Sequence, residues 1–137
     1  ILRVKQIRRF INIPPGSVWE RICACAGIIS EFGEISRFKN ADAMIAFAGL
    51  EPSISESGTE SHSGKMVKHG SGHLRYYLLN VADYVFLHEP IFTEFYYKKR
   101  NEGKSHQVAL NHVAKKLIRI IYKLETENIK FDSSKCK

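Results

Sequence analysis

A stretch rich in glycine and hydroxyl side chains, from Glu51 to Arg75, interrupts a chain whose other segments show apolar residues at helical spacing. Its four glycines and its many serines disfavour a regular helix, because glycine loses backbone entropy on folding and serine competes for backbone hydrogen bonds. A core therefore has to form from helical segments on either side of this stretch. The sequence predicts a mainly α fold, a single small helical domain with a Ser/Gly-rich functional loop.

Capping residues and helix-ending residues divide the rest of the chain into helical segments. Ser17, Asn40 and Ser71 suit N-cap positions, and Pro90 suits the first turn of a helix. Neither an internal repeat nor a period-two strand series is evident. The predicted helices are about 18–32, after Asn40 through Phe47, after Ser71 through Phe86, from Pro90 up to Gly103, and about 105–124. In the last of them we expect Val108, Val113, Leu117, Ile120, Ile121 and Leu124 to face inward.

With 137 residues the chain can bury one core but is too short for two ordinary domains. No apolar stretch reaches the length of a membrane span, and no signal-peptide pattern opens the chain. The three cysteines, Cys23, Cys25 and Cys136, match neither a zinc knuckle nor a secreted disulfide framework, so we expect reduced structural thiols. These features predict a soluble cytoplasmic protein without a membrane partner.

The positive charge of the chain is confined to one region. Residues 64–123 hold 11 Lys and Arg against 4 Asp and Glu, whereas the segments before and after this region are each balanced. A concentrated positive field attracts a phosphate backbone through charge pairing and counterion release, which favours nucleic acid as a partner. The alternative is a helix face that is merely solvated.

The loop becomes basic before it enters the third helix, and it can surround a phosphate with one serine oxygen and several cations. Lys65, Lys68 and Arg75 are close enough in sequence to line one phosphate track, and the glycines between them let the backbone approach it. Two alternatives stay open at this point. The serines are also typical of a flexible linker, and Arg75 could pair with Asp83 or Glu56 instead.

His69 and His73 are four residues apart, as metal ligands on one helix face would be. The glycines between them disfavour a helix there and no third ligand is evident, so we predict no metal site. Tyr97 is followed by three basic residues and is the aromatic residue expected to be exposed, which makes it a candidate nucleic-acid contact. Lys104 precedes the last helix and could lie beside a phosphate or simply be solvated.

Several short elements follow one another between Phe32 and Leu124: Glu34-Ile35-Ser36-Arg37-Phe38, Ala46-Phe47-Ala48-Gly49-Leu50-Glu51-Pro52, Ser57-Gly58-Thr59, Leu74-Arg75, Phe95-Tyr96, Gly103-Lys104 and Lys116-Leu117. In this order and spacing they resemble the C-terminal domain of the insertion-sequence transposases grouped with the Piv-type DNA invertases, also called DEDD-type or bridge-RNA-guided recombinases. The resemblance assigns 32–124 to that domain, 1–31 to a divergent N-terminal segment and 125–137 to a tail.

The resemblance implies a catalytic serine, which is Ser57 here, for DNA transposition and site-specific recombination. Its attack on a DNA phosphodiester would leave a covalent phosphoserine link that keeps the bond energy for rejoining. Lys65, Lys68 and Arg75 would hold the phosphate, and His69 stands where relatives commonly carry arginine. Lys104 matches the Gly-Lys element of the family and joins Tyr97 as a nucleic-acid-binding residue.

The chain departs from the family at its start. Ile13-Pro14-Pro15-Gly16-Ser17 replaces the Ile-Pro-Gly-x-Gly turn of a helix-hairpin-helix element, and Val18 to Gly27 also differs from the pattern. The chain also begins without the upstream RNase-H-like domain whose acidic residues hold magnesium in the family. We therefore expect no cofactor in this chain and no complete recombination by it alone, with Mg²⁺ in the missing acidic domain.

The resemblance implies DNA as the partner, a guide RNA as a further candidate partner, and a homo-oligomer in the full-length parent. It also implies a bacterial or archaeal, nucleoid-associated protein. Two rival interpretations stay open. One is a non-enzymatic basic module that binds nucleic acid and gives Ser57 no special role, and the other is a decayed transposase fragment.

Overall fold

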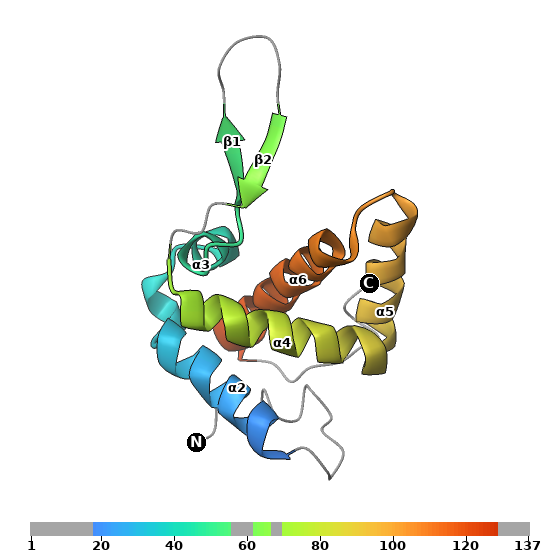
Figure 1. Cartoon of the computed structure of the whole chain (residues 1–137). Helices are drawn as coiled ribbons and strands as arrows, with labels where there is room; N and C mark the ends of the chain where they lie inside the picture. The colour runs from blue at the N-terminus through green and yellow to red at the C-terminus, as the bar shows by residue number, and fades with distance from the viewer. Residues whose placement is uncertain (1–17, 56–61, 67–69, 129–137) are drawn as a thin grey trace.

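The computed structural model describes residues 18–55, 62–66 and 70–128. Over these residues it contains five α-helices, one short 3-10 helix and one antiparallel hairpin (Figure 1). The predicted mainly α fold is confirmed. The elements are α2 (Val18–Phe32), η1 (Ile35–Arg37), α3 (Ala41–Phe47), β1 (Pro52–Ser55), β2 (His62–Met66), α4 (Gly72–His88), α5 (Pro90–Asn101) and α6 (His106–Glu127). None of the described helices is long and apolar enough to cross a membrane.

Two of the predicted N-caps, Asn40 and Ser71, are confirmed by side-chain hydrogen bonds, and Ser105 is a further cap that was not predicted. Asn40 Oδ1 accepts from the Ala43 amide at 2.8 Å, Ser71 Oγ from the Leu74 amide at 3.2 Å, and Ser105 Oγ from the Val108 amide at 3.4 Å. Each bond satisfies an amide that has no partner within its own helix. The remaining predicted cap, Ser17, lies outside the described residues.

Helix α4 lies at the centre of the helical body, where it contacts α2, α5 and α6 (Figure 1). Its buried stripe, which includes Leu74, Leu78 and Val85, packs into one continuous apolar core. Large side chains that are almost completely buried come from every helix: Ile28, Phe32, Met44, Leu74, Leu78, Val85, Phe92, Val113, Leu117 and Ile118. The core therefore joins residues from both sides of the glycine- and serine-rich stretch.

One expectation about the last helix is wrong. Val108 was expected to face inward, but its side chain is 40% exposed. Successive residues of an α-helix are rotated by about 100° around the helix axis. This rotation places Val108 on the side of α6 that faces away from its buried residues. The buried residues of α6 are Ala109, Leu110, Val113, Ala114, Leu117, Ile118 and Ile121.

Cys25 is a free thiol in the core, at 1% exposure. Burial raises the pKa of this thiol to about 11, because the apolar surroundings disfavour the charged thiolate. The thiol is therefore protonated near neutral pH and acts as a small apolar core residue. Cys23 is in α2, and Cys136 lies outside the described residues.

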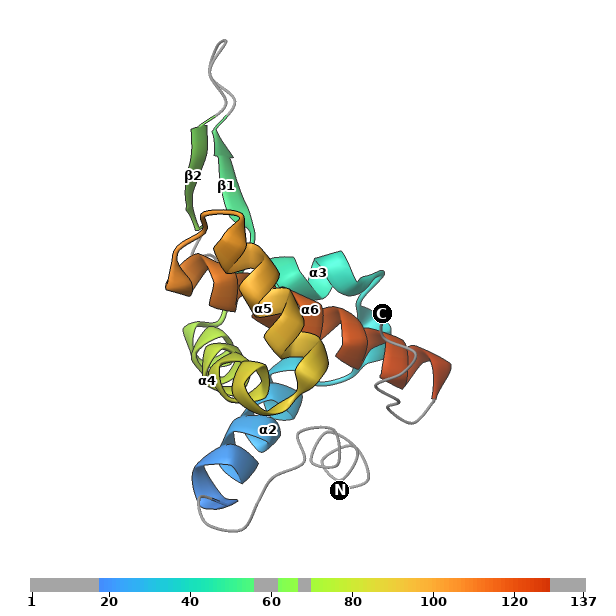
Figure 2. The same cartoon turned by 90° about the vertical axis from the view of Figure 1, so that its right-hand side faces the viewer.

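The main difference from the sequence analysis is the hairpin formed by β1 and β2, because this segment was expected to be a loop. Figures 1 and 2 both show the hairpin projecting away from the helical body, beyond α3. The paired residues are Pro52 with Met66, Ile54 with Ser63, and Ser55 with His62. The register shifts between the first two pairs, so that Gly64 and Lys65 together oppose one residue of β1.

Gly70 allows the chain to return from the hairpin to α4. Its φ is +106°, and a side-chain carbon built on it would overlap the carbonyl oxygen of Phe47. An L-residue would be strained in this conformation and would also have to displace the end of α3. The close approach of Gly70 to Phe47 therefore holds the end of α3 beside the start of α4.

The Gly70→Ala variant is expected to lower the free energy of unfolding by about 3 kcal/mol, because backbone strain and overpacking both act at this position. Gly103→Ala is the matched control. Gly103 has a φ of +83°, but a side-chain carbon there would meet no atom within 4 Å, so only strain of about 1 kcal/mol is expected. Denaturant unfolding at constant m-value measures both, and equal losses would contradict the role of the close approach.

Candidate nucleic-acid interface

The hairpin carries the predicted catalytic serine in the segment between its strands. Ser57, Lys68 and His69 lie outside the described residues, so their roles stay predictions. Lys65 belongs to β2 and lies in the register shift beside Gly64. At about 3.3 Å per residue, the Lys65 backbone is about 10 Å along the strand from the Ser55–His62 pair, where residues 56–61 leave the strands.

Arg75 lies in the first turn of α4, and its side chain is half-buried. Its Nη1 atom is buried and has no hydrogen-bond partner among the described residues. The described residues also contain no ion pair between Arg75 and Asp83, which was one alternative for this side chain, whereas Glu56 lies outside the description. A buried, unsatisfied guanidinium donor costs stability, and an anionic ligand would remove that cost.

Ser71 positions the turn that carries Arg75. Its hydroxyl donates to Glu31 Oε2 at 2.7 Å and accepts from the Leu74 amide at 3.2 Å. The start of α4 is thereby joined to the end of α2, and the Arg75 amide donates to the Ser71 carbonyl at 3.1 Å. Glu31 and Ser71 are 40 residues apart, and no pattern in a single sequence could have revealed this contact.

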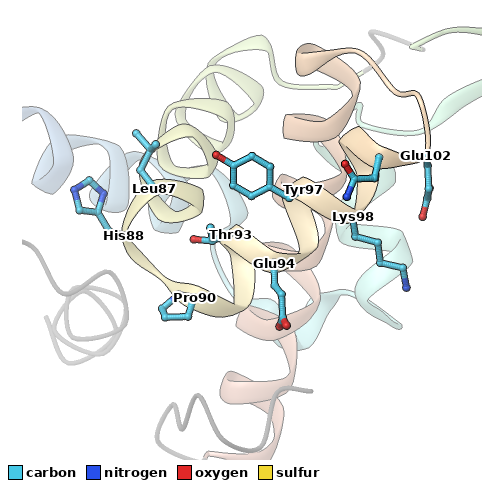
Figure 3. Close-up of a pocket in the computed structure, with 9 residues that line it drawn as sticks. Leu87, His88, Pro90, Thr93, Glu94, Tyr97, Lys98 and Glu102 are labelled. Atoms are coloured by element: carbon cyan, nitrogen blue, oxygen red, sulfur yellow. The ribbon is translucent and has the colours of Figure 1, made fainter.

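Tyr97 is exposed as predicted, at 55%, but it lies away from Arg75. It lines an open groove beside Leu87, near the end of α4, and Figure 3 shows its ring pointing from α5 toward Leu87. At 1.5 Å per residue, Leu87 is about 18 Å along α4 from Arg75. Glu94 and Glu102 also line this groove, so its charge is mixed.

Lys104 follows the end of α5 and is half-buried. Its carbonyl accepts from Arg100 Nη1 at 2.8 Å, and its amide donates to the Lys99 carbonyl at 3.3 Å. These backbone contacts close α5 and leave the Lys104 ammonium with no ion pair among the described residues. Lys99 is paired differently, since its ammonium bonds Glu102 at 3.0 Å and thereby lowers the pKa of that carboxyl.

Lys115 belongs to the basic region predicted over 64–123, but neither it nor His112 was named as a candidate binding residue. Burial is the largest cause that lowers the pKa of His112, and the positive charge of Lys115 is the next. Lys99 and Lys104 lower this pKa further, whereas Glu102 has a weaker opposing effect. Burial and Arg119 likewise lower the pKa of Lys115, against Glu51. The outward helical spacing of 112, 115 and 119 was the available signal.

The described residues do not gather a metal site. No group of three or more His, Cys, Asp or Glu side chains comes together within 18–55, 62–66 and 70–128. His73 is exposed at the start of α4, and His69 lies outside the description.

Comparison with protein families gives a match to the family described as transposase IS116/IS110/IS902, over residues 21–97. The matched residues make up more than half of the 137-residue chain. They include most of α2, the whole hairpin segment and Arg75, and they also include 21–31, which the sequence analysis assigned to a divergent segment. No curated protein matches the chain.

The lowered pKa of His112 predicts a pH-dependent stability. Because its pKa is lower in the folded than in the unfolded chain, the unfolded chain binds more protons between the two values. The free energy of unfolding should therefore fall as pH drops from about 7.5 through this interval, and level off below the folded-state pKa. Thermal unfolding of His112→Gln should show a smaller loss, whereas the exposed-histidine control His73→Gln should behave like the wild type. An unchanged pH dependence in His112→Gln would contradict the assignment.

Proposed function

Because the chain belongs to the transposase IS116/IS110/IS902 family, we propose that it is the DNA-binding C-terminal domain of an insertion-sequence transposase, in which Ser57 attacks a DNA phosphodiester. The observation that carries the proposal is the buried Nη1 of Arg75, which has no partner among the described residues. Arg75 is held at the start of α4, directly after the segment that returns from the hairpin. A guanidinium donor without a partner among the described residues suits a phosphate oxygen.

The proposed chemistry is a transesterification. The Ser57 oxygen forms a bond to phosphorus, the sugar oxygen of one strand end leaves, and the hydroxyl proton passes to a base. The number of phosphate ester bonds is unchanged, so rejoining to another strand needs no external energy source. Lys65, Lys68, His69 and Arg75 would hold the phosphate and stabilise the charge that develops in the transition state.

The parent enzyme needs more than this domain. We assign the chain to the DEDD-type, Piv-related group, in which an upstream acidic domain holds Mg²⁺ and a guide RNA selects the DNA. The described residues do not gather a metal site, and this chain would contribute only its own side chains to the reaction. In the full-length parent the domain would act within a homo-oligomer, whereas alone it would bind DNA without completing recombination. Tyr97 and Lys104 are proposed as further nucleic-acid contacts.

Reconstitution tests the role of Ser57. Adding the acidic domain, Mg²⁺ and a nicked suicide DNA substrate should yield a covalent protein–DNA adduct, which Ser57→Ala should reduce at least about a thousandfold because the nucleophile is lost. Ser61→Ala is the matched control, since it removes a hydroxyl from the same segment. Denaturing gels measure the adduct.

The outcomes separate the rival functions. Equal loss of adduct in Ser57→Ala and Ser61→Ala would contradict a dedicated nucleophile. A wild-type chain that binds DNA with a strong salt dependence but forms no adduct would be a binding module instead. A chain that does neither would be a decayed fragment.

Arg75 has its own test. Arg75→Gln should slow adduct formation about a hundredfold, because one phosphate-stabilising donor is lost, while the free energy of unfolding changes by less than about 1 kcal/mol. The fold uses no hydrogen bond from Nη1 among the described residues, which is the reason for the small effect on stability. Lys98→Gln, which removes a positive charge from α5, is the control and should retain the wild-type rate. A large loss of stability with an unchanged rate would make Arg75 a structural residue.

A further inference from the structure

The solvent side of α6 is basic over its whole central part. From 107 to 124 the chain contains no Asp or Glu. The five basic or imidazole side chains of this segment share the side of α6 opposite its buried residues. We call them the α6 ridge: His112, Lys115, Lys116, Arg119 and Lys123.

The ridge is narrow and straight. At 100° and 1.5 Å per residue, its five positions fall within an arc of about 100° and extend for about 16 Å along the helix. Lys116 borders α5, where its ammonium lies 4.7 Å from the centre of the Phe95 ring. Arg119 borders α3, where it lies 3.4 Å from Asp42. The ridge therefore occupies the surface of α6 between α3 and α5, which Figure 1 shows on either side of α6.

Two acidic side chains of the described residues act on the ridge. Asp42 is paired with Arg119 at the exposed surface, and Glu51, which precedes the hairpin, acts on Lys115. Lys115 and His112 are each half-buried and each have a lowered pKa, in both cases first through burial and then through a neighbouring positive group. Like charges held together in a partly desolvated site repel one another, and an anionic partner would relieve that repulsion.

The ridge passes the base of the hairpin. Glu51 directly precedes β1 and lies within electrostatic reach of Lys115, in the middle of the ridge. At its N-terminal end the ridge comes close to Lys104, whose positive charge lowers the pKa of His112. A polyanion that contacts the start of the hairpin can therefore continue along the positive side chains of α6.

We propose that the α6 ridge is a second binding surface for the phosphate backbone of double-stranded DNA, separate from the hairpin and used to hold the duplex beside it. The choice of DNA over other polyanions rests on the proposed transposase function. One strand of a duplex carries a phosphate about every 3.4 Å along the axis, so a ridge of about 16 Å faces about five base pairs. The ridge supplies affinity without reading base sequence, because its groups contact phosphates.

The test is the salt dependence of binding to an intact linear duplex, measured by fluorescence anisotropy in the presence of a chelator so that no strand is cut. Each phosphate contact contributes roughly 0.9 to the slope of log K against log salt concentration. The triple variant Lys115→Gln/Arg119→Gln/Lys123→Gln should therefore reduce the slope by roughly 2.7. Because Lys115 is half-buried, circular dichroism should confirm that this variant is folded.

A matched pair of single variants keeps the test independent of folding. Lys123→Gln and Lys98→Gln each remove one exposed positive charge, the first from the ridge and the second from the mixed-charge groove on α5 (Figure 3). We expect Lys123→Gln to reduce the slope by roughly 0.9 and Lys98→Gln to leave it unchanged. Equal effects would show that only net charge matters and would overturn the proposal.

Two further outcomes are informative. Loss of slope with an RNA duplex but not with a DNA duplex of equal length would overturn the assignment to DNA. The binding measurement needs no nucleophile, so failure to form the Ser57 adduct would leave the ridge standing. Conversely, ridge variants that bind the duplex with an unchanged salt slope would overturn the ridge proposal and leave the proposed Ser57 adduct untouched.

Discussion

The first turn of α4 is the constraint on which the rest of the structure depends. Gly70 brings the chain against the Phe47 carbonyl at the end of α3, and Ser71 then bonds both Glu31 of α2 and the Leu74 amide. Gly70 and Ser71 thus connect α2, α3 and α4 directly before the buried stripe of α4 begins. The hairpin leaves and re-enters the helical body beside this junction, so its direction depends on the same contacts. Arg75 lies one turn further along α4, on backbone that these contacts hold in place.

The helices could be predicted from the sequence because their determinants are local. Caps such as Asn40 and Ser71 act on amides three residues away, and the stripe of α4 follows from the repeat of the helix itself. The hairpin could not be predicted in this way. Its strands contain proline, serine and glycine, which have low strand propensity. The strands also pair across a longer connecting segment and not across a two-residue hairpin turn, which is the strongest local signal for a hairpin. Ser71 with Glu31 is a further case, since it depends on how α2 and α4 pack.

The candidate site was predicted only in part for the same reason. Arg75 and Tyr97 were singled out together, but Arg75 lies in the first turn of α4, whereas Tyr97 belongs to α5 and lines the groove near the other end of α4. A linear sequence gives no measure of that separation. The outward spacing of Lys115 and Arg119 was visible, whereas their closeness to Glu51 and Asp42 required the packing of α6 against α3. Charge composition therefore located the basic region, and tertiary packing divided it into a hairpin side, the α6 ridge and a groove of mixed charge.

The arginines of the described chain show how the fold distinguishes structural from available cations. Arg37 stacks over Phe38 and Phe47, with its guanidinium carbon 4.7 Å and 4.9 Å from the two ring centres. Arg100 bonds the Lys104 carbonyl, and Arg119 pairs with Asp42. Arg75 differs, because its Nη1 is buried yet finds no partner among the described residues. Burial without a partner is unfavourable in the free protein, so a phosphate that accepts from this atom gains the interaction and also removes the cost. The fold thus leaves a donor for a phosphate at the start of α4, where the chain returns from the hairpin.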